Sequence, residues 1–147
     1  VQTADCLPVF LASKEGAEIA VVHAGWKGLA SGIVENTVAA MTTPKERVVA
    51  WLGPAIGACH FEVGSEVRAA FLASDALSGL ERCFAKATKA DKYMADLYGI
   101  ARMKLEALGV HSVSGGDSCT HCDEDKFYSY RRDGVTGRML NAIYIEA

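Results

Sequence analysis

One stretch near the N-terminus, TADCLPVFLASKEGAEIAVVHAGWKG at positions 3–28, restricts the fold more than any other part of the chain. Two apolar runs, at residues 7–12 and 19–22, flank a polar segment at residues 13–16, which is typical of a β-hairpin with its turn in that segment. If the turn is centred there, residues whose numbers add up to about 29–31 face each other across the two strands. The hairpin therefore brings Cys6 opposite His23 or within two residues of it.

A cysteine beside a histidine suits two kinds of chemistry. The imidazole can hold the cysteine as a thiolate nucleophile, or both side chains can bind zinc or copper, which favour nitrogen and sulfur ligands. A structural explanation also exists, because free cysteines are often simply buried, and two ligands are fewer than a zinc site requires. The residues alone leave these alternatives open.

Composition and charge limit the class of protein. The chain has 147 residues, 50% of them hydrophobic, and a net charge of −3, which fits one globular domain over residues 1–147. No apolar run approaches the roughly 18 residues of a membrane span, and the scattered charges of both signs predict neither a nucleic acid nor a membrane partner. Five cysteines without a regular framework favour reduced thiols and the cytoplasm. Because Val1 enters a predicted strand directly, we expect an N-terminal part to be missing.

Apolar residues at helical or alternating spacing divide the rest of the chain into further elements. The pattern predicts helices at residues 29–41, 66–72 and 92–108, with strands at 47–52, within 110–116 and at 137–147. Pro44 follows the first helix, Ser65 caps the second and Gly109 ends the third. Because strands and helices alternate around at least one hairpin, we expect an α/β domain of the α+β type, a layered sandwich with a mixed β-sheet and flanking helices.

Two further segments are candidates for substrate binding. Gly25, Trp26, Lys27 and Gly28 lie between a predicted strand and a predicted helix, where glycines allow a ligand to approach the backbone and a helix start offers N–H groups to an anion. A tight turn with a packed tryptophan explains the same residues without a ligand.

The segment FYSYRRDGVTGRM at residues 127–139 combines arginines with aromatic rings. Arg131, Arg132 and Arg138 can bind phosphate in bidentate fashion, and the neighbouring aromatic side chains can stack on a planar ring. A turn with exposed arginines on its flanks is the alternative.

A cysteine pair near the C-terminus looks like half of a zinc knuckle. Cys119 and Cys122 are spaced as in such a motif, with His121 between them. The sequence shows no matching second pair, because Cys59-His60 and Cys83 lack the complementary spacing. We therefore expect these residues, together with His111, to be structural or incidental.

Taken in order, five blocks of this chain resemble one family closely. The blocks are TADCLPV, HAGWKG, WLGPAIGACHFEVGSEV, DLYGIARMKLEALGV and FYSYRRDGVTGRM, and they are similar to the successive signatures of the YfiH/YlmD family. That family is described both as multicopper polyphenol oxidoreductase (laccase-like) and as purine nucleoside phosphorylase. The resemblance extends from Thr3 to about Ile145 and corresponds to the C-terminal part of a family member.

The resemblance implies a metal site and a reaction. It makes Cys6 and His23 metal ligands, for zinc or copper, and it places the third ligand, a histidine, before Val1. Lys27 departs from the family pattern, where many relatives carry arginine. The implied reaction is phosphorolysis of adenosine and inosine to the base and ribose 1-phosphate, with adenosine deamination and cleavage of methylthioadenosine as side activities. Arg131 or Arg132 would hold the phosphate, and a purine nucleoside and phosphate would be the ligands; the oligomeric state stays open.

Two other enzyme classes remain alternatives. A copper-dependent polyphenol oxidase of the laccase type normally needs several coppers and many histidines, whereas this chain has four. A cysteine hydrolase would use Cys6 as nucleophile and His23 as base. A non-enzymatic domain that binds a partner and holds a structural metal is the third alternative.

Overall fold

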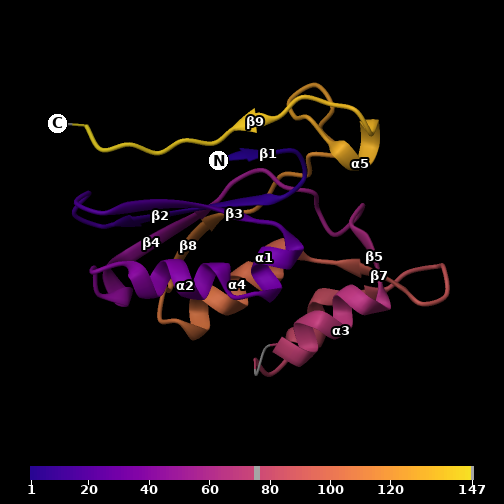
Figure 1. The fold of residues 1–147 in the computed structure, drawn as a ribbon, viewed down its shortest axis with the longest axis horizontal. Coiled ribbons are helices and arrows are strands. Elements are labelled where there is room, and N and C mark those ends of the chain that lie inside the picture. Colours follow the sequence, from indigo (N-terminus) through magenta and orange to yellow (C-terminus); the bar gives the residue numbers. More distant parts are fainter. Residues whose placement is uncertain (75–76, 147) are drawn as a thin grey trace.

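A mixed four-stranded sheet forms the centre of the fold in this computed structural model, which describes residues 1–74 and 77–146 (Figure 1). Its strands lie in the order β3 (Ile19–Ala24), β2 (Leu7–Ser13), β4 (Val48–Leu52) and β8 (Ser112–Gly115). The central strand β2 is antiparallel to β3 and β4, and β4 is parallel to β8. The predicted hairpin and the mixed sheet are thus confirmed.

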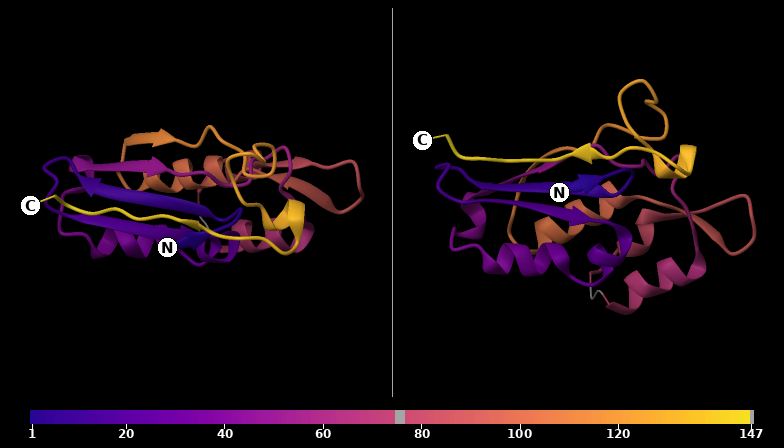
Figure 2. Two further views of the ribbon diagram at one scale, coloured as in Figure 1. Left: turned by 90° about the horizontal axis from the view of Figure 1, so that it is seen from above. Right: turned by 45° about the horizontal axis from the view of Figure 1, so that its top comes forward.

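Three helices cover one face of this sheet: α1 (Trp26–Ala30), α2 (Ile33–Ala40) and α4 (Leu97–Ala107) (Figures 1 and 2). Alternate residues of β2 point into the core, so Leu7, Val9 and Leu11 are fully buried. Each such side chain contributes about 1.5–3 kcal/mol on burial. An ion pair between the buried Lys104 on α4 and the partly exposed Glu35 on α2 joins two of these helices. The layered α/β fold that the sequence predicts is confirmed.

Smaller elements surround the sheet and its helices. At one end, a second sheet of β5 (Glu62–Gly64), β7 (Lys92–Ala95) and β6 (Phe84–Lys86) lies beside α3 (Ser65–Ser74). Over the other face, β1 (Gln2–Thr3) pairs antiparallel with β9 (Met139–Leu140), and α5 (Tyr130–Asp133) precedes β9. Two short 3-10 turns span Lys45–Arg47 and Leu80–Cys83.

The prediction of one helix at residues 29–41 was wrong, because a turn at residues 31–32 separates two helices there. Gly32 has a φ of 79°, in the left-handed region, and it separates α1 from α2. A glycine adopts this conformation without a steric penalty, so the chain changes direction there. As a result α1 is only five residues long.

The helix expected at residues 92–108 begins later than predicted. Its first four residues form strand β7, and the Asp96 side chain caps α4 by accepting a hydrogen bond from the Gly99 amide at 2.9 Å. Gly109, with a φ of 85°, ends the helix as predicted. Of the C-terminal strand expected at 137–147, the structure forms only β9, and Ala147 lies outside the described residues.

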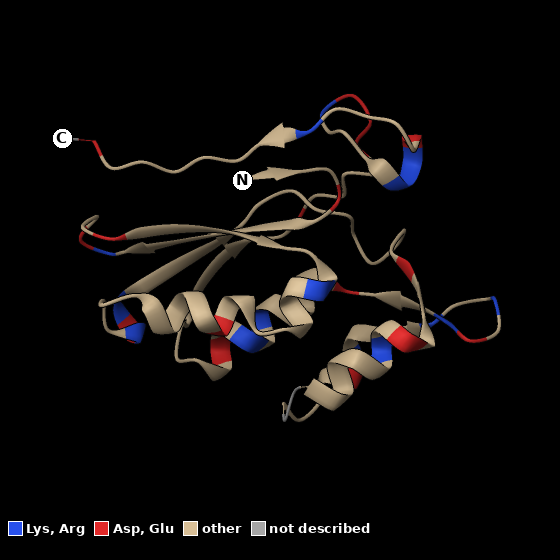
Figure 3. Cartoon of the chain, in the orientation of Figure 1, with Lys and Arg blue, Asp and Glu red and all other residues tan. Residues whose placement is uncertain are grey.

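Lysine, arginine and acidic residues are interspersed over the helices and loops (Figure 3). Within the described part of the chain, no helix has both the length and the apolar character that crossing a membrane demands.

Candidate active site

A cavity of about 400 Å³ lies where the open end of the hairpin meets β1, the loop after β4 and helix α5. Segments far apart in the sequence supply its walls. Its charged, aromatic and potential metal-binding side chains are Asp5, Cys6, His23, Trp26, Phe61, Tyr130, Arg131 and Arg138. Its volume falls in the range of about 300–1,000 Å³ that is usual for small-molecule sites.

The hairpin has the predicted register, and Cys6 and His23 both line this cavity. Pro8 pairs with His23 and Leu7 pairs with Ala24, so Cys6 precedes the ladder at the same end of the hairpin. Both side chains converge on Gly25. A Cβ on that glycine would lie 2.9 Å from Cys6 Sγ and 3.8 Å from His23 Nε2, so the missing side chain leaves room for both groups.

Burial raises the pKa of the Cys6 thiol, and the nearby Asp5 charge adds to this, while Arg138 opposes it. A cysteine that acts as a free nucleophile needs the opposite shift, because the thiolate is the reactive form. In the absence of a metal, Cys6 is therefore held as a thiol.

Asp5 is a central residue of the site that sequence reasoning missed. Its φ is 86°, which is rare for a residue other than glycine, and only 9% of it is exposed. One carboxylate oxygen accepts from the Thr120 hydroxyl at 2.6 Å and the other from the Arg131 amide at 2.7 Å. These partners are more than 100 positions away in the sequence, so only the strained turn before Cys6 hints at the role.

Of the three arginines considered above, Arg131 and Arg138 line the cavity. The Nη1 group of Arg131 donates to the carbonyls of His60 and Glu62 at 3.2 and 3.0 Å, and its guanidinium lies 5.4 Å from the centre of the Phe61 ring. Both hydrogen bonds leave from one nitrogen of a group with five N–H donors. These two bonds thus hold Arg131 at the cavity wall and use the donors of Nη1 alone.

Arg132, which the sequence predicted as a phosphate-binding residue on equal terms with Arg131, does not line this cavity. Its guanidinium donates to the carbonyls of Thr120, His121 and Phe127 at 2.8–3.2 Å and pairs with the Asp133 carboxylate. These contacts hold the loop between β8 and α5 together. The structure therefore favours Arg131 over Arg132 as a ligand-binding arginine.

The segment from Gly25 to Gly28 contributes unequally to the cavity. Trp26 lines it and Gly25 lies against Cys6. Lys27 is exposed, with its Nζ 5.7 Å from the centre of the Trp26 ring, and Gly28 makes room for Ile33, whose Cγ2 would lie 3.3 Å from an added Cβ. Since α1 is so short, its dipole offers an anion little. Phosphate binding by Lys27 and Gly28 stays a prediction without support from these contacts.

The expectation that Cys119 and Cys122 lack partners was wrong. The turn after β4 places Cys59 and His60 beside them, and the ligand atoms of all four lie within 4.8 Å of one another. Burial opposes the Cys119 thiolate, but hydrogen bonds from the Gly57 and Cys122 amides, the Cys122 thiol and the His60 ring outweigh it and lower the pKa of Cys119 to about 7.

The other two residues set aside with this cluster lie away from the cavity. Cys83 is buried, with its sulfur 3.8 Å from that of Met103. His111 is exposed and contacts Glu106 at 2.9 Å. Their expected structural or incidental character agrees with these positions.

Tyr98 ties together the two loops that follow β4 and β8. Its buried hydroxyl accepts a hydrogen bond from the Ala55 amide at 2.7 Å and donates to the Ser118 carbonyl at 2.9 Å. Burial raises the pKa of Tyr98 to about 12, although the hydrogen bond with Ala55 opposes the rise. The group therefore stays protonated and keeps both bonds.

We expect Tyr98→Phe to lower the free energy of unfolding by about 1–3 kcal/mol, because the buried Ala55 amide loses its acceptor. Urea unfolding followed by circular dichroism measures the change. Tyr144→Phe is the matched control, since Tyr144 is 76% exposed and should change stability by less than about 0.5 kcal/mol. Equal effects of the two substitutions would contradict the role given to Tyr98.

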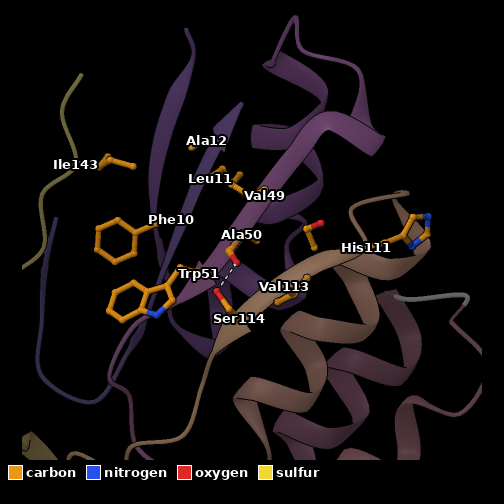
Figure 4. Close-up of a pocket in the computed structure, with 11 residues that line it drawn as sticks. Phe10, Leu11, Ala12, Val49, Ala50, Trp51, His111, Val113, Ser114 and Ile143 are labelled. Atoms are coloured by element: carbon orange, nitrogen blue, oxygen red, sulfur yellow. Dashed lines mark hydrogen bonds between the residues drawn. The ribbon is translucent and has the colours of Figure 1, made fainter. Parts of the chain in front are cut away.

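A larger hollow of about 480 Å³ lies on the sheet itself, beside the rings of Phe10 and Trp51 (Figure 4). Its lining is aliphatic and aromatic apart from Ser112, Ser114 and His111. It offers an apolar surface, whereas the smaller cavity combines a thiol, an imidazole, a carboxylate and two guanidinium groups. The smaller cavity is therefore the candidate active site.

Cys6 and His23 fit part of a metal site. Their convergence on Gly25 brings one sulfur and one imidazole nitrogen to the same wall of the cavity, a donor pair that zinc and copper accept. A catalytic zinc normally has three protein ligands, and the third ligand that the resemblance places before Val1 stays a prediction.

Comparison with known proteins identifies the family of this chain. Residues 1–146 match the family described as multi-copper polyphenol oxidoreductase laccase. The chain is 49% identical over 145 residues to purine nucleoside phosphorylase YfiH of Shigella flexneri, covering 99% of this chain and 58% of that protein. It is 44% identical to a purine nucleoside phosphorylase of Pseudomonas aeruginosa, covering 99% of this chain and 60% of that one. The chain thus spans little more than half the length of these relatives.

Solved structures show the same fold. The crystal structure of a Neisseria meningitidis protein has a TM-score of 0.89 at 47% identity, covering 94% of this chain and 56% of that one. That of YlmD from Geobacillus stearothermophilus has a TM-score of 0.85 at 32% identity, covering 93% and 53%. With a family match over nearly the whole chain and relatives close to half identical, the chain belongs to the multi-copper polyphenol oxidoreductase laccase family, that of the YfiH and YlmD proteins.

Proposed function

We propose that the protein is a metal-dependent purine nucleoside phosphorylase, which transfers the ribosyl group of adenosine or inosine to phosphate and releases the base. The observation that carries this proposal is the cavity, in which Cys6 and His23 share a wall with two guanidinium groups and three aromatic rings. The names of the Shigella flexneri and Pseudomonas aeruginosa relatives support it. Adenosine deamination and cleavage of methylthioadenosine are side activities of the same proposal.

The residues of the cavity match the parts of a nucleoside and a phosphate. A purine base is planar and stacks on aromatic faces, which Trp26, Phe61 and Tyr130 provide. Phosphate is recognised by guanidinium groups, whose fork matches its oxygens, and Arg131 and Arg138 supply two.

In this reaction a phosphate oxygen forms a bond to the anomeric carbon of the ribose while the bond from that carbon to the base breaks. The electron pair of the broken bond leaves with the base, which takes up a proton, and ribose 1-phosphate is the other product. Positive charge develops on the sugar in an oxocarbenium-like transition state. Arg131 and Arg138 would hold the phosphate anion against that charge in a fixed orientation, which lowers the barrier.

A zinc or copper ion would be held by Cys6 and His23. When bound, it would supply a Lewis acid for a substrate oxygen or lower the pKa of a water molecule. Asp5, the nearly buried residue before Cys6, fixes the Arg131 backbone by accepting a hydrogen bond from its amide.

The alternatives have weaker support. Polyphenol oxidation rests on the description of the family, but His23 is the one histidine among the described residues that line the cavity, and laccase chemistry normally uses many. A cysteine hydrolase would need an activated thiolate, whereas burial and the Asp5 charge raise the pKa of Cys6.

The ligands and the cellular location follow from the same reaction. We propose a purine nucleoside and inorganic phosphate as the ligands. All five cysteines are free thiols, which agrees with a reducing compartment such as the cytoplasm.

The proposal is tested by chromatography of inosine and adenosine incubated with the purified protein, with and without phosphate. The protein should carry the segment before Val1 if its gene encodes one. Free base that appears only with phosphate is the expected result. Folded, metal-loaded protein that releases no base under either condition would overturn the proposal and bring phenol oxidation forward.

Substitution of the two arginines distinguishes their roles. We expect Arg131→Ala to raise the KM for phosphate by about 10–100-fold, because a hydrogen bond to a charged group contributes about 1.5–3 kcal/mol. Arg132→Ala should instead lower the midpoint of thermal unfolding and leave the phosphate KM within about threefold, a difference below 1 kcal/mol. Initial rates at varied phosphate give the KM values. The reverse pattern would assign phosphate to Arg132 and contradict the assignment made here.

A further inference from the structure

Two turns far apart in the sequence meet beside the candidate active site. Cys59 and His60 lie in the turn after β4, and Cys119 and Cys122 lie in the turn after β8. Because β4 and β8 are parallel neighbours, the turns that follow them lie at the same end of the sheet, beyond the C-terminal ends of both strands. The pairing continues beyond the strands, since Ala55 bridges to Cys119 and the Thr120 amide donates to the Ala55 carbonyl at 3.0 Å.

The ligand atoms of the four side chains lie close enough together to surround one ion, within 4.8 Å of one another. Cys59 Sγ lies 3.7 Å from the Sγ atoms of Cys119 and Cys122. His60 Nδ1 lies 3.2, 3.9 and 3.3 Å from the sulfurs of Cys59, Cys119 and Cys122. A tetrahedral zinc site with Zn–S bonds of about 2.3 Å and a Zn–N bond of about 2.0–2.1 Å has edges of about 3.8 Å between sulfurs and about 3.5 Å from nitrogen to sulfur. The observed distances scatter around these values.

The surrounding backbone leaves room for this arrangement. A Cβ at Gly57 would lie 3.3 Å from Cys119 Sγ and 3.4 Å from Cys59 Sγ, so any larger residue there would press on both sulfurs. The Gly57 amide donates to Cys119 Sγ at 3.2 Å, a bond that favours a thiolate. The His60 ring stacks on His121 with centroids 3.9 Å apart and an interplanar angle of 11°, which supports the orientation that directs Nδ1 at the sulfurs.

We propose that Cys59, His60, Cys119 and Cys122 form a structural zinc site of the Cys₃His type. Three thiolates and one imidazole are a donor set that zinc prefers over harder cations such as magnesium. Four protein ligands leave no open position, so the ion would connect the two turns without activating a substrate. The site uses none of the residues that line the candidate active site.

The position of this site gives the ion a further effect. The His60 carbonyl accepts from Arg131 Nη1 at 3.2 Å, and the Thr120 hydroxyl, next to Cys119, donates to Asp5. Fixing the two turns would therefore also fix Arg131 and Asp5.

The test is the zinc content of the protein, purified under reducing conditions with Zn²⁺ as the added metal and then dialysed. A Cys6→Ser/His23→Ala background removes the other two candidate ligands. In that background we expect about one tightly held Zn²⁺ per chain, and Co²⁺ in its place should give the intense visible bands and sulfur-to-cobalt charge transfer of a tetrahedral thiolate site.

Adding Cys59→Ser and Cys122→Ser should lower the affinity for Zn²⁺ by at least about 100-fold, since even outer partners of a metal site contribute 10–100-fold. Cys83→Ser is the matched control, because Cys83 lies outside the cluster, and it should leave the zinc content unchanged. If the cluster variant does not fold, the Co²⁺ spectrum of the background protein decides alone.

Three results would overturn the proposal. Background protein that keeps no zinc after dialysis would do so, as would a Co²⁺ spectrum typical of oxygen ligands. The third is a disulfide that joins two of the three cluster cysteines in protein kept under reducing conditions, because its sulfurs cannot then bind the ion.

Discussion

Cys6→Ala is expected to lower kcat/KM for inosine phosphorolysis by at least about 1,000-fold, equivalent to about 4 kcal/mol of lost transition-state stabilisation. Cys6 lines the cavity and its sulfur shares the space beside Gly25 with the His23 ring. Under the proposed function it is a metal ligand, and two protein ligands cannot hold the ion as three do. The rate of hypoxanthine release, followed by chromatography, measures the effect.

His23→Ala should cost as much, and the double variant should be no slower than either single variant. Groups that hold one ion act as a unit, so their effects do not add. Cys83→Ala is the control for loss of a thiol, because Cys83 is buried among helices away from the cavity. A folded Cys6→Ala protein that turns over inosine at the wild-type rate would remove Cys6 from the proposed machinery.

Asp5→Ala is expected to lower the free energy of unfolding by at least about 4 kcal/mol. The carboxylate accepts from Thr120 and Arg131 while nearly buried, and each hydrogen bond to a charged group contributes about 1.5–3 kcal/mol. Alanine also tolerates a positive φ poorly, at a cost of about 1–2 kcal/mol. Urea unfolding at a fixed pH near 7 measures the change.

Asp5→Asn serves as the control for this substitution. Asparagine tolerates the left-handed region and keeps one oxygen as acceptor, so it should lose about half as much stability as alanine. If alanine and asparagine destabilise the protein equally and by less than about 1 kcal/mol, which is typical of surface changes, the carboxylate does not have the role proposed here.

The hairpin and the position of Cys6 and His23 were predictable because they depend on local signals. A polar turn between two apolar runs sets the register of two neighbouring strands, and the observed pairing of Leu7 with Ala24 follows from it. The break between α1 and α2 at Gly32 was not predicted, because apolar residues keep their helical spacing on both sides of it. A glycine in the left-handed conformation does not change that spacing. The start of α4 was missed for a similar reason: the short strand β7 precedes the Asp96 cap without a gap in the apolar pattern.

The roles of Asp5 and Cys59 were beyond local reasoning. Asp5 acts through Arg131, which lies 126 positions later, and Cys59 meets Cys119 across 60 positions. Metal-ligand spacing in a sequence is informative when one turn supplies both ligands, as for Cys119 and Cys122. When the second pair of ligands follows a neighbouring parallel strand, the two pairs cannot be matched until the sheet topology is known. The sequences of the two segments do not indicate that β4 pairs with β8.

The pairing of β1 with β9 has a consequence for synthesis. The β1–β9 ladder and the bond from Asp5 to the Arg131 amide join residues at least 126 positions apart, whereas the hairpin with Cys6 and His23 closes over a short loop and forms early. At the usual rate of elongation, the roughly 110 residues from His23 to Arg131 take about 5–20 s to appear on the ribosome. During that interval the nascent chain presents a thiol and an imidazole before the arginines that line the same cavity have been synthesised. A metal ion can therefore reach this pair before Arg131 has been synthesised.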